Sequence, residues 1–105
     1  MRAKRKDRNH NEIAEAFSAF GFEVFDTSAT GNGFPDMVVW RPRNGYILVE
    51  VKDGLKVPSA RRLTQAEDNF SRRFPVAVVY RVSDVVEIAN GSAFDVPRVD
   101  INKID

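Results

Sequence analysis

The chain has 105 residues and a formal net charge of +1, and 43% of its side chains are apolar while 30% are charged. This length allows one domain with a modest core and excludes two, and the apolar content favours folding over disorder. The sequence has no cysteine, which excludes disulfides and thiolate metal sites. It also lacks the roughly 18-residue apolar run of a membrane span and the apolar core of a signal peptide. We therefore expect a cytoplasmic protein.

Charge is spread unevenly along the chain. The first eight residues, MRAKRKDR, carry five basic side chains against one acidic side chain, whereas the segment from Asp84 to Asp105 is mostly acidic. This asymmetry predicts a basic face for a polyanion, and a solvated, flexible start over residues 1–8 is the plain alternative. We expect residues 1–105 to form a single domain, with residues 92–105 as a tail whose structure the sequence does not predict.

The first predicted element is a helix between Asn9 and Phe20. Its apolar residues, at positions 13, 16, 17 and 20, fall at i, i+3, i+4 and i+7 and form one stripe. Gly21 follows and is expected to end the helix. The segment FEVFD, residues 22–26, predicts a strand, and TSATGNG, residues 27–33, predicts a flexible loop.

Two strongly apolar strands follow, DMVVW at residues 36–40 and YILVEVK at residues 46–52, joined by the connection RPRNG. Strands that are apolar on both faces are typical of a central, covered sheet. The five-residue connection is short enough for the two strands to pair as an antiparallel hairpin.

The rest of the chain predicts a long helix, a strand and a short helix. The long helix covers KVPSARRLTQAEDNFSRRF, residues 56–74, with Pro58 and Ser59 as start signals. VAVVY, residues 76–80, predicts a buried strand, and SDVVEIAN, residues 83–90, predicts the short helix. The order α-β-β-β-α-β-α therefore predicts an α/β fold of three layers, with a mixed central sheet and helices on both sides.

The hairpin strands carry charge where a buried strand usually has none. If Trp40 pairs with Tyr46, antiparallel counting places Asp36 opposite Glu50, with Cβ atoms about 4.5–5.5 Å apart. Lys52 lies on the same face as Glu50, because side chains alternate along a strand. Two close carboxylates repel each other unless a cation lies between them, which favours a Mg²⁺ site in which the lysine positions the attacking water or stabilises developing negative charge. A structural ion pair beside a solvated glutamate is the alternative.

The segments GFPDMVVW and ILVEVKDG resemble the PD-(D/E)xK nuclease signature, with Pro35 and Asp36 as its first half and residues 50–52 as its second. With DRNHNEI in the first helix, the glycine before PD, and SARRLT after EVKDG, the pattern is similar to the virus-type replication-repair (VRR-NUC) nucleases in their small stand-alone phage and bacterial form. The similarity covers about residues 7 to 82. It implies a restriction-endonuclease-like fold and a metal-dependent DNA endonuclease in a bacterial or phage-infected cell.

The resemblance assigns the central roles to four residues. Asp36 and Glu50 would bind Mg²⁺ or Mn²⁺, the Val51 carbonyl would be a further ligand, and Lys52 would be catalytic.

The resemblance also implies a contribution from each of the two longer helices. Many relatives add a metal-binding glutamate from the first helix; Glu12 is our choice, Glu15 is the other candidate, and a solvated acid is the alternative for both. Relatives commonly carry a glutamine or an acid in the helix after the motif lysine. Gln65 is our catalytic candidate at that place, and Glu67 competes with it.

Clustered basic residues predict phosphate contacts, which give affinity without sequence choice. The candidates are Lys4, Arg5, Lys6, Arg8, Lys56, Arg61 and Arg62. We find no base-reading module in the sequence, so DNA would be recognised by shape. Stand-alone relatives act as homodimers on Holliday junctions, which implies a homodimer on branched DNA and a place in DNA repair. A non-catalytic DNA-binding or assembly module and a flap or nicking nuclease are the alternatives.

Overall fold

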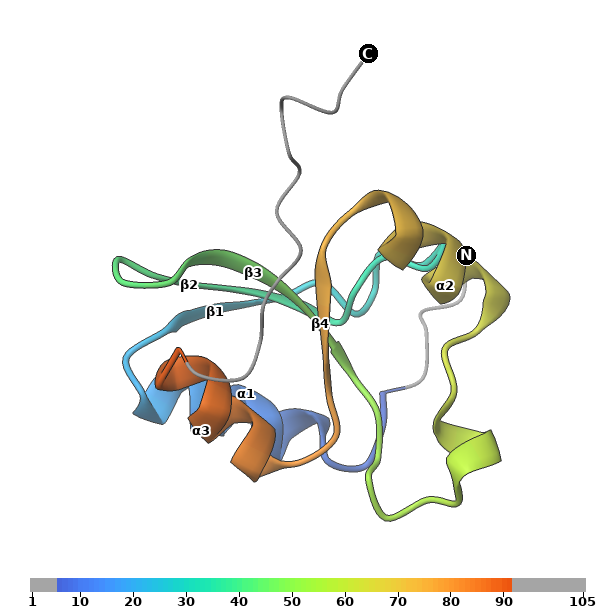
Figure 1. Cartoon of the computed structure of the whole chain (residues 1–105), viewed down its shortest axis with the longest axis horizontal. Helices are drawn as coiled ribbons and strands as arrows, with labels where there is room; N and C mark the ends of the chain where they lie inside the picture. Colours follow the sequence, from blue (N-terminus) through green and yellow to red (C-terminus); the bar gives the residue numbers. More distant parts are fainter. Residues whose placement is uncertain (1–5, 92–105) are drawn as a thin grey trace.

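The structure is a computed structural model that describes residues 6–91 (Figure 1). Its elements are α1 His10–Ala19, β1 Glu23–Asp26, β2 Met37–Arg41, β3 Gly45–Val51, the 3-10 helix η1 Pro58–Arg61, α2 Gln65–Arg73, β4 Val76–Val79 and α3 Val82–Ala89. The predicted order is confirmed, with η1 added before α2. Lys4, Arg5 and the tail 92–105 lie outside the described residues. Over residues 6–91, no helix has the length and apolar content needed to cross a membrane.

Within the described chain, four strands form one mixed sheet in the order β1-β2-β3-β4. β1, β2 and β3 are antiparallel neighbours, and β4 runs parallel to β3. In the hairpin, Trp40 pairs with Tyr46 and Val38 pairs with Leu48, as predicted. The connection from β3 to β4 runs through η1 and α2, because parallel strands cannot be joined by a tight turn.

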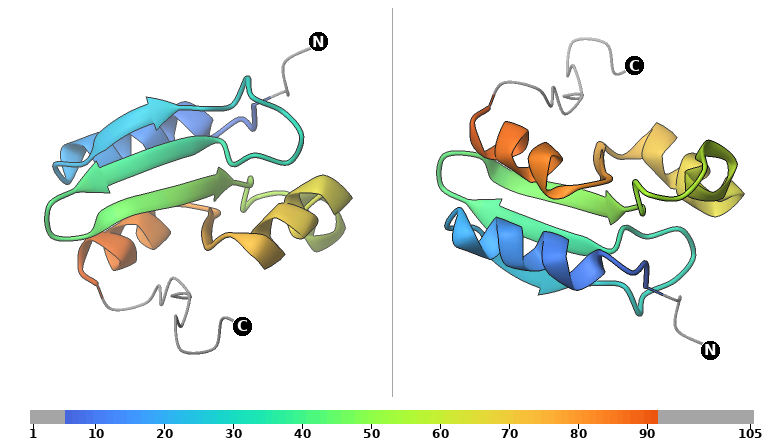
Figure 2. Two further views of the ribbon diagram at one scale, coloured as in Figure 1. Left: turned by 90° about the horizontal axis from the view of Figure 1, so that it is seen from above. Right: turned by 90° about the horizontal axis from the view of Figure 1, so that it is seen from below.

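One face of the sheet is covered by α1 and α3, which contact each other (Figure 2). Alternate strand residues point toward these helices, and they are buried: Met37, Val39, Ile47, Val49, Val51, Ala77 and Val79. Ile13 and Phe17 from α1 and Val85 from α3 pack against them at 0% exposure. Each fully buried Val, Ile, Met or Phe side chain contributes about 1.5–3 kcal/mol, so this layer is the hydrophobic core. The predicted apolar stripe of the first helix is confirmed at Ile13 and Phe17, whereas Phe20, its predicted last member, follows the end of α1 and is 37% exposed.

The opposite face, which we call the outer face, is only partly covered. Figure 1 shows α2 on this side of the sheet, toward one end, with α1 and α3 on the other side. On the outer face Phe25, Trp40 and Tyr46 are 71%, 36% and 79% exposed. The prediction of a hairpin covered on both faces is therefore wrong for the part of the chain that the structure describes. The reason is that α2 is short and packs against a loop instead of across the strands.

The predicted helix over residues 56–74 is divided into two. After η1 the backbone is extended, and α2 begins only at Gln65. The Thr64 hydroxyl accepts a hydrogen bond from the Glu67 N–H, and the Glu67 carboxylate accepts one from the Thr64 N–H. This reciprocal capping box starts a new helix in the middle of the predicted one.

The loop before β2 lies against the first turn of α2. Gly33 has a φ of +81°, and a Cβ atom at this position would clash with the backbone carbonyl of Ala66. Next to it, the Phe34 ring packs edge-on against Phe70, with 5.2 Å between ring centroids. Only glycine fits this close approach, so the loop and α2 are held together beside the end of the hairpin.

Candidate active site

Asp36 lies at the point where the loop enters β2. Met37 pairs with Val49. One residue further along the same antiparallel register, Asp36 and Glu50 are opposite each other, as predicted. Asp36 is 2% exposed, and its Oδ2 accepts a hydrogen bond from the Val51 N–H at 2.8 Å. The carboxylate therefore satisfies a buried amide at the end of β3.

Lys52 lies between two glutamates. Its Nζ donates a hydrogen bond to Glu67 Oε1 at 2.7 Å and is 3.8 Å from Glu50 Oε2. Lys52, Glu50 and Glu67 are 8%, 2% and 5% exposed. The two carboxylates hold the buried ammonium in position. Removal of either partner would leave uncompensated charge in a low dielectric, which is costly. The predicted placement of Glu50 and Lys52 on one face is confirmed by this contact.

The donor set suits a hard divalent cation. Asp36 and Glu50 are buried carboxylates from neighbouring strands, and the Val51 backbone lies against Asp36. Mg²⁺ is usually held by one or two carboxylates with several waters retained, a need that this pair and the Val51 carbonyl can meet. Among residues 6–91, no three His, Cys, Asp or Glu side chains gather as a possible metal site. A metal here would therefore depend on two carboxylates and one backbone carbonyl.

A cleft of about 840 Å³ opens beside this group, and we call it the main cleft. Lys52, Glu67 and residues 31–33 line it. Its further lining consists of Lys6, Asp7, Arg8, Asp53, Lys56 and Thr64. Asp36 and Glu50 are buried, at 2% exposure each, so Lys52 and Glu67 are the members of the group that face the cleft.

Of the two candidates in the helix after the motif lysine, the structure brings Glu67 to Lys52 and leaves Gln65 away from it. Gln65 is exposed, and its Nε2 donates to Asn69 Oδ1 at 2.9 Å. The resemblance implies a glutamine or an acid at this place; Gln65 was our choice, and the contact with Lys52 favours Glu67. The signal that identifies Glu67 is its spacing from the preceding threonine, T-x-x-E, which is typical of a capping box.

The structure does not bring a helix α1 glutamate to the two carboxylates. Glu12 and Glu15 are both exposed, and α1 covers the opposite face of the sheet. Glu12 lines a small cavity of about 220 Å³ together with Arg8, Asp53 and Arg81. Within the described chain, neither glutamate forms a three-carboxylate group with Asp36 and Glu50.

Three of the five described residues predicted to contact phosphate are paired with acids. The pairs are Lys6–Asp26 at 2.8 Å, Arg8–Asp53 at 3.1 Å and Lys56–Asp7 at 3.1 Å. Lys6 and Asp26 are both 46% exposed, and ion pairs of exposed side chains contribute only about 0–1 kcal/mol, so a phosphate can replace the carboxylate of this pair. Arg61 donates to the Gly54 carbonyl at 3.2 Å, and Arg62 is exposed.

Arg8 and Asp53 form a fixed pair at the rim of the main cleft. Two guanidinium nitrogens of Arg8 donate to the two carboxylate oxygens, and the Leu55 N–H donates a third hydrogen bond. The Arg8 hydrogen bond, followed by that of Leu55, holds the pKa of Asp53 below its usual range. The same pairing raises the pKa of Arg8, so both groups keep their charges at neutral pH.

Asn9 was missed in the sequence analysis, and it supports Lys52 from the α1 side of the sheet. Its Nδ2 donates to the Lys52 carbonyl at 3.2 Å and to the Tyr80 carbonyl at 3.0 Å. Asn9 is 6% exposed and makes no side-chain cap hydrogen bond to α1. Its amide therefore joins the ends of the parallel strands β3 and β4. From the sequence alone, an asparagine before a helix would have predicted only a helix cap.

Comparisons of this chain with protein-family models, with curated proteins and with solved structures found no match. Chemically, two buried carboxylates beside a fixed ammonium can hold a hard cation and place a charged donor next to it.

Proposed function

We propose that this chain is a metal-dependent endonuclease of the VRR-NUC type, which hydrolyses DNA phosphodiester bonds. The observation that carries the proposal is the burial of Asp36, Glu50 and Lys52 together at one end of the hairpin. Well-packed apolar residues can replace a buried ion pair with little loss of stability or even a gain. Three buried charges on adjacent strands therefore favour a chemical role over a structural one.

The proposed roles follow from the contacts. Asp36, Glu50 and the Val51 carbonyl would hold Mg²⁺ or Mn²⁺, which supplies charge neutralisation on the phosphodiester and a lowered pKa for a bound water. Lys52 positions that water or stabilises the negative charge that develops on the phosphate. Glu67 acts as a positioning residue, because its carboxylate holds the ammonium in place.

The substrate proposed for this site is branched DNA, such as a Holliday junction. Lys6, Arg8 and Lys56 line the main cleft beside Lys52, where they would contact phosphates. Such contacts carry no base information, so selection would depend on the shape of the DNA.

We further propose a restriction-endonuclease-like arrangement that works as a homodimer, with the second copy on the outer face. Phe25, Trp40 and Tyr46 present exposed apolar surface there, and the Trp40 and Tyr46 rings lie 6.1 Å apart. Large exposed apolar patches mark interaction sites. A two-fold dimer also gives two equivalent sites for a substrate that has two equivalent strands.

Two rivals use the same fold. A non-catalytic DNA-binding or assembly module needs basic surface but no buried carboxylates, so Asp36 and Glu50 favour the enzyme. A flap or nicking nuclease uses the same chemistry and differs only in the DNA structure that is cut.

A cleavage assay on end-labelled junction, flap, nicked, duplex and single-stranded DNA tests these alternatives. We expect Mg²⁺- or Mn²⁺-dependent cleavage that is fastest on the junction and absent in EDTA. Fastest cleavage of the flap or nicked duplex would favour the flap or nicking nuclease. Binding without cleavage of any substrate in either metal would favour the non-catalytic module.

A further inference from the structure

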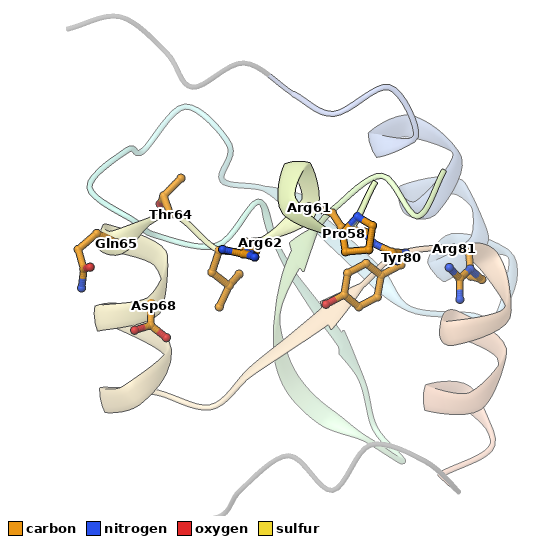
Figure 3. A pocket seen from close by; sticks show the side chains of 9 residues that line it. Pro58, Arg61, Arg62, Thr64, Gln65, Asp68, Tyr80 and Arg81 are labelled. Atoms are coloured by element: carbon orange, nitrogen blue, oxygen red, sulfur yellow. The ribbon is translucent and has the colours of Figure 1, made fainter. Parts of the chain in front are cut away.

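A second hollow, of about 710 Å³, lies next to the main cleft, and we call it the arginine hollow. The lining residues on which the argument depends are Arg61, Arg62, Thr64, Asp68, Tyr80 and Arg81. Figure 3 shows these side chains spread from the start of α2, past Arg62 and Arg61, to Tyr80 and Arg81 at the end of β4. The hollow thus combines three arginines with one tyrosine and one carboxylate.

Within residues 6–91, none of Arg61, Arg62 and Arg81 forms an ion pair with a carboxylate. The lysine and arginine side chains of the main cleft, in contrast, are paired with acidic side chains. The single carboxylate of the arginine hollow, Asp68, is paired with Arg72 at 3.0 Å. Unpaired guanidinium groups gathered in one hollow attract an anion, and their planar forks suit phosphate oxygens.

Two of these arginines lie next to the candidate active site. Arg61 donates to the Gly54 carbonyl, and the guanidinium of Arg81 lies so close to Gly54 that a Cβ atom there would be 2.8 Å from Nη2. Gly54 follows Lys52 by two residues. Thr64 lines both the main cleft and the arginine hollow, so a strand that leaves the cleft over Thr64 enters the hollow.

Tyr80 gives the hollow an aromatic surface as well as positive charge. It is half-buried, and the Arg61 guanidinium carbon lies 5.9 Å from its ring centroid. Grooves that combine basic and aromatic side chains are typical of single-strand binding. The phosphates contact the lysine and arginine side chains, while the nucleobases stack on the aromatic rings. In a paired duplex the base faces are stacked on each other and are not available to a tyrosine.

We propose that the arginine hollow binds an unpaired stretch of nucleic-acid strand next to the bond that is cut, with Arg61, Arg62 and Arg81 on its phosphates and Tyr80 against a base. This inference rests on the proposed nuclease function and adds to it a preference for single-stranded DNA at the branch point. The hollow lies outside the Asp36–Glu50–Lys52 group, so its binding does not require the metal.

The test is fluorescence anisotropy of the full chain in EDTA, with a labelled oligothymidine and a labelled hairpin duplex. The variant is Arg62→Ala with Arg81→Ala, two exposed side chains whose loss should leave the fold intact. The control is Arg43→Ala with Arg73→Ala, which removes the same charge outside the hollow. We expect the variant to bind oligothymidine at least about tenfold more weakly, and to lose about 1.4 from the slope of log affinity against log salt, because each phosphate contact on a single strand contributes about 0.7.

Two results would overturn the phosphate contacts: equal weakening by the control pair, or an unchanged affinity of the variant. Thermal melting by circular dichroism confirms that both double variants are folded. Equal weakening of oligothymidine and duplex binding would overturn the assignment to an unpaired strand.

The tyrosine is tested separately. Tyr80→Leu should weaken oligothymidine binding about fivefold or more while duplex binding stays constant, and Tyr80→Phe, which keeps the ring, should bind like the wild type. A loss with Tyr80→Phe equal to that with Tyr80→Leu would overturn stacking.

These measurements use no cleavage, so the two proposals fail separately. A chain that cuts DNA but binds independently of the hollow overturns this inference alone. A chain that binds through the hollow but cuts nothing overturns the nuclease proposal alone.

Discussion

Glu67 has two roles at one position, because it caps α2 and pairs with Lys52. In Glu67→Ala the helix loses its capping box, and among the described residues the buried ammonium is left with Glu50, at 3.8 Å, as its acidic neighbour. A lost cap costs about 1 kcal/mol, and a broken buried ion pair about 3–5 kcal/mol. We therefore expect the free energy of unfolding to fall by about 3 kcal/mol or more, as measured by urea denaturation.

Gln65→Ala is the matched control in the same turn of α2. Its side chain is exposed and bonds only to Asn69 among the described contacts, so we expect a change within about 0.5 kcal/mol. A larger loss from Gln65→Ala than from Glu67→Ala would contradict the placement of Glu67 against Lys52.

Gly33 offers a second test at the scale of one residue. Its positive φ disfavours a side chain, and a Cβ atom would also meet the backbone of Ala66. Gly33→Ala should therefore destabilise the protein by clearly more than the roughly 1 kcal/mol expected for the left-handed backbone alone. Gly45, with φ of +72° and open space around it, isolates the backbone term, so Gly45→Ala is the control. Equal midpoints for the two variants in thermal melting would contradict the close approach of the loop and α2.

Residue placement was predictable from the sequence where strand geometry alone decided it. Alternation and hairpin counting placed Asp36, Glu50 and Lys52 on one face, and the observed register agrees. The choice between Gln65 and Glu67 was not predictable in the same way. It depends on where α2 begins and on how its first turn meets Lys52, and neither can be read from the sequence pattern.

At the scale of elements, α1 and β1 are joined through Asp26. Burial acts to raise the pKa of this carboxyl, but hydrogen bonds from Lys6 and from the hydroxyl and amide of Ser28 outweigh it, and the charge of His10 adds to them. The pKa of Asp26 is therefore well below its usual value of 3.8. Its side chain is 46% exposed, so solvent and salt reduce the contribution to stability.

The sign of the pH dependence follows from this shift. A carboxyl whose pKa is lower in the folded state adds stability above its unfolded pKa, and this stability is lost as pH falls below about 4 toward the folded pKa. We expect Asp26→Asn to be less stable than the wild type at pH 7 and to lose less stability between pH 5 and pH 2. Glu23→Gln, an exposed position on the same strand, is the control. Parallel stability curves for wild type and Asp26→Asn would contradict the expectation.

The predicted elements agree with the structure wherever apolar periodicity was strong. The α1 stripe, the strands β2, β3 and β4, and α3 all bury an apolar face against one another, so their pattern carries the information. The break between η1 and α2 does not appear in that pattern, because it depends on a local cap at Thr64. The sequence also could not predict how much of the outer face α2 covers, because apolar residues at alternate positions do not show which element packs on them.

At the scale of the whole molecule, the outer face is the proposed dimer interface. Tyr46 and Phe25 are the most exposed of its aromatic side chains, so Phe25→Glu with Tyr46→Glu should convert a dimer into a monomer by placing charge at a buried interface. Light scattering should give twice the 11.9 kDa chain mass for the wild type and the single mass for the variant.

Leu55→Glu is the control for this experiment. Leu55 is 84% exposed but lies beyond the end of β3, away from the outer face, so this variant should remain a dimer. A wild type that is monomeric at micromolar concentration would contradict the proposed interface.

The most direct test of the nuclease proposal is the rate of junction cleavage in Mg²⁺ by Asp36→Asn against the wild type, with DNA binding measured in EDTA. The asparagine amide oxygen can still accept the Val51 N–H, so the fold is kept while the charge that would hold the ion is removed. We expect cleavage to fall at least about 100-fold while binding stays within about threefold. Cleavage by Asp36→Asn at the wild-type rate, or equal cleavage by the wild type in EDTA, would contradict a metal-dependent nuclease at this site.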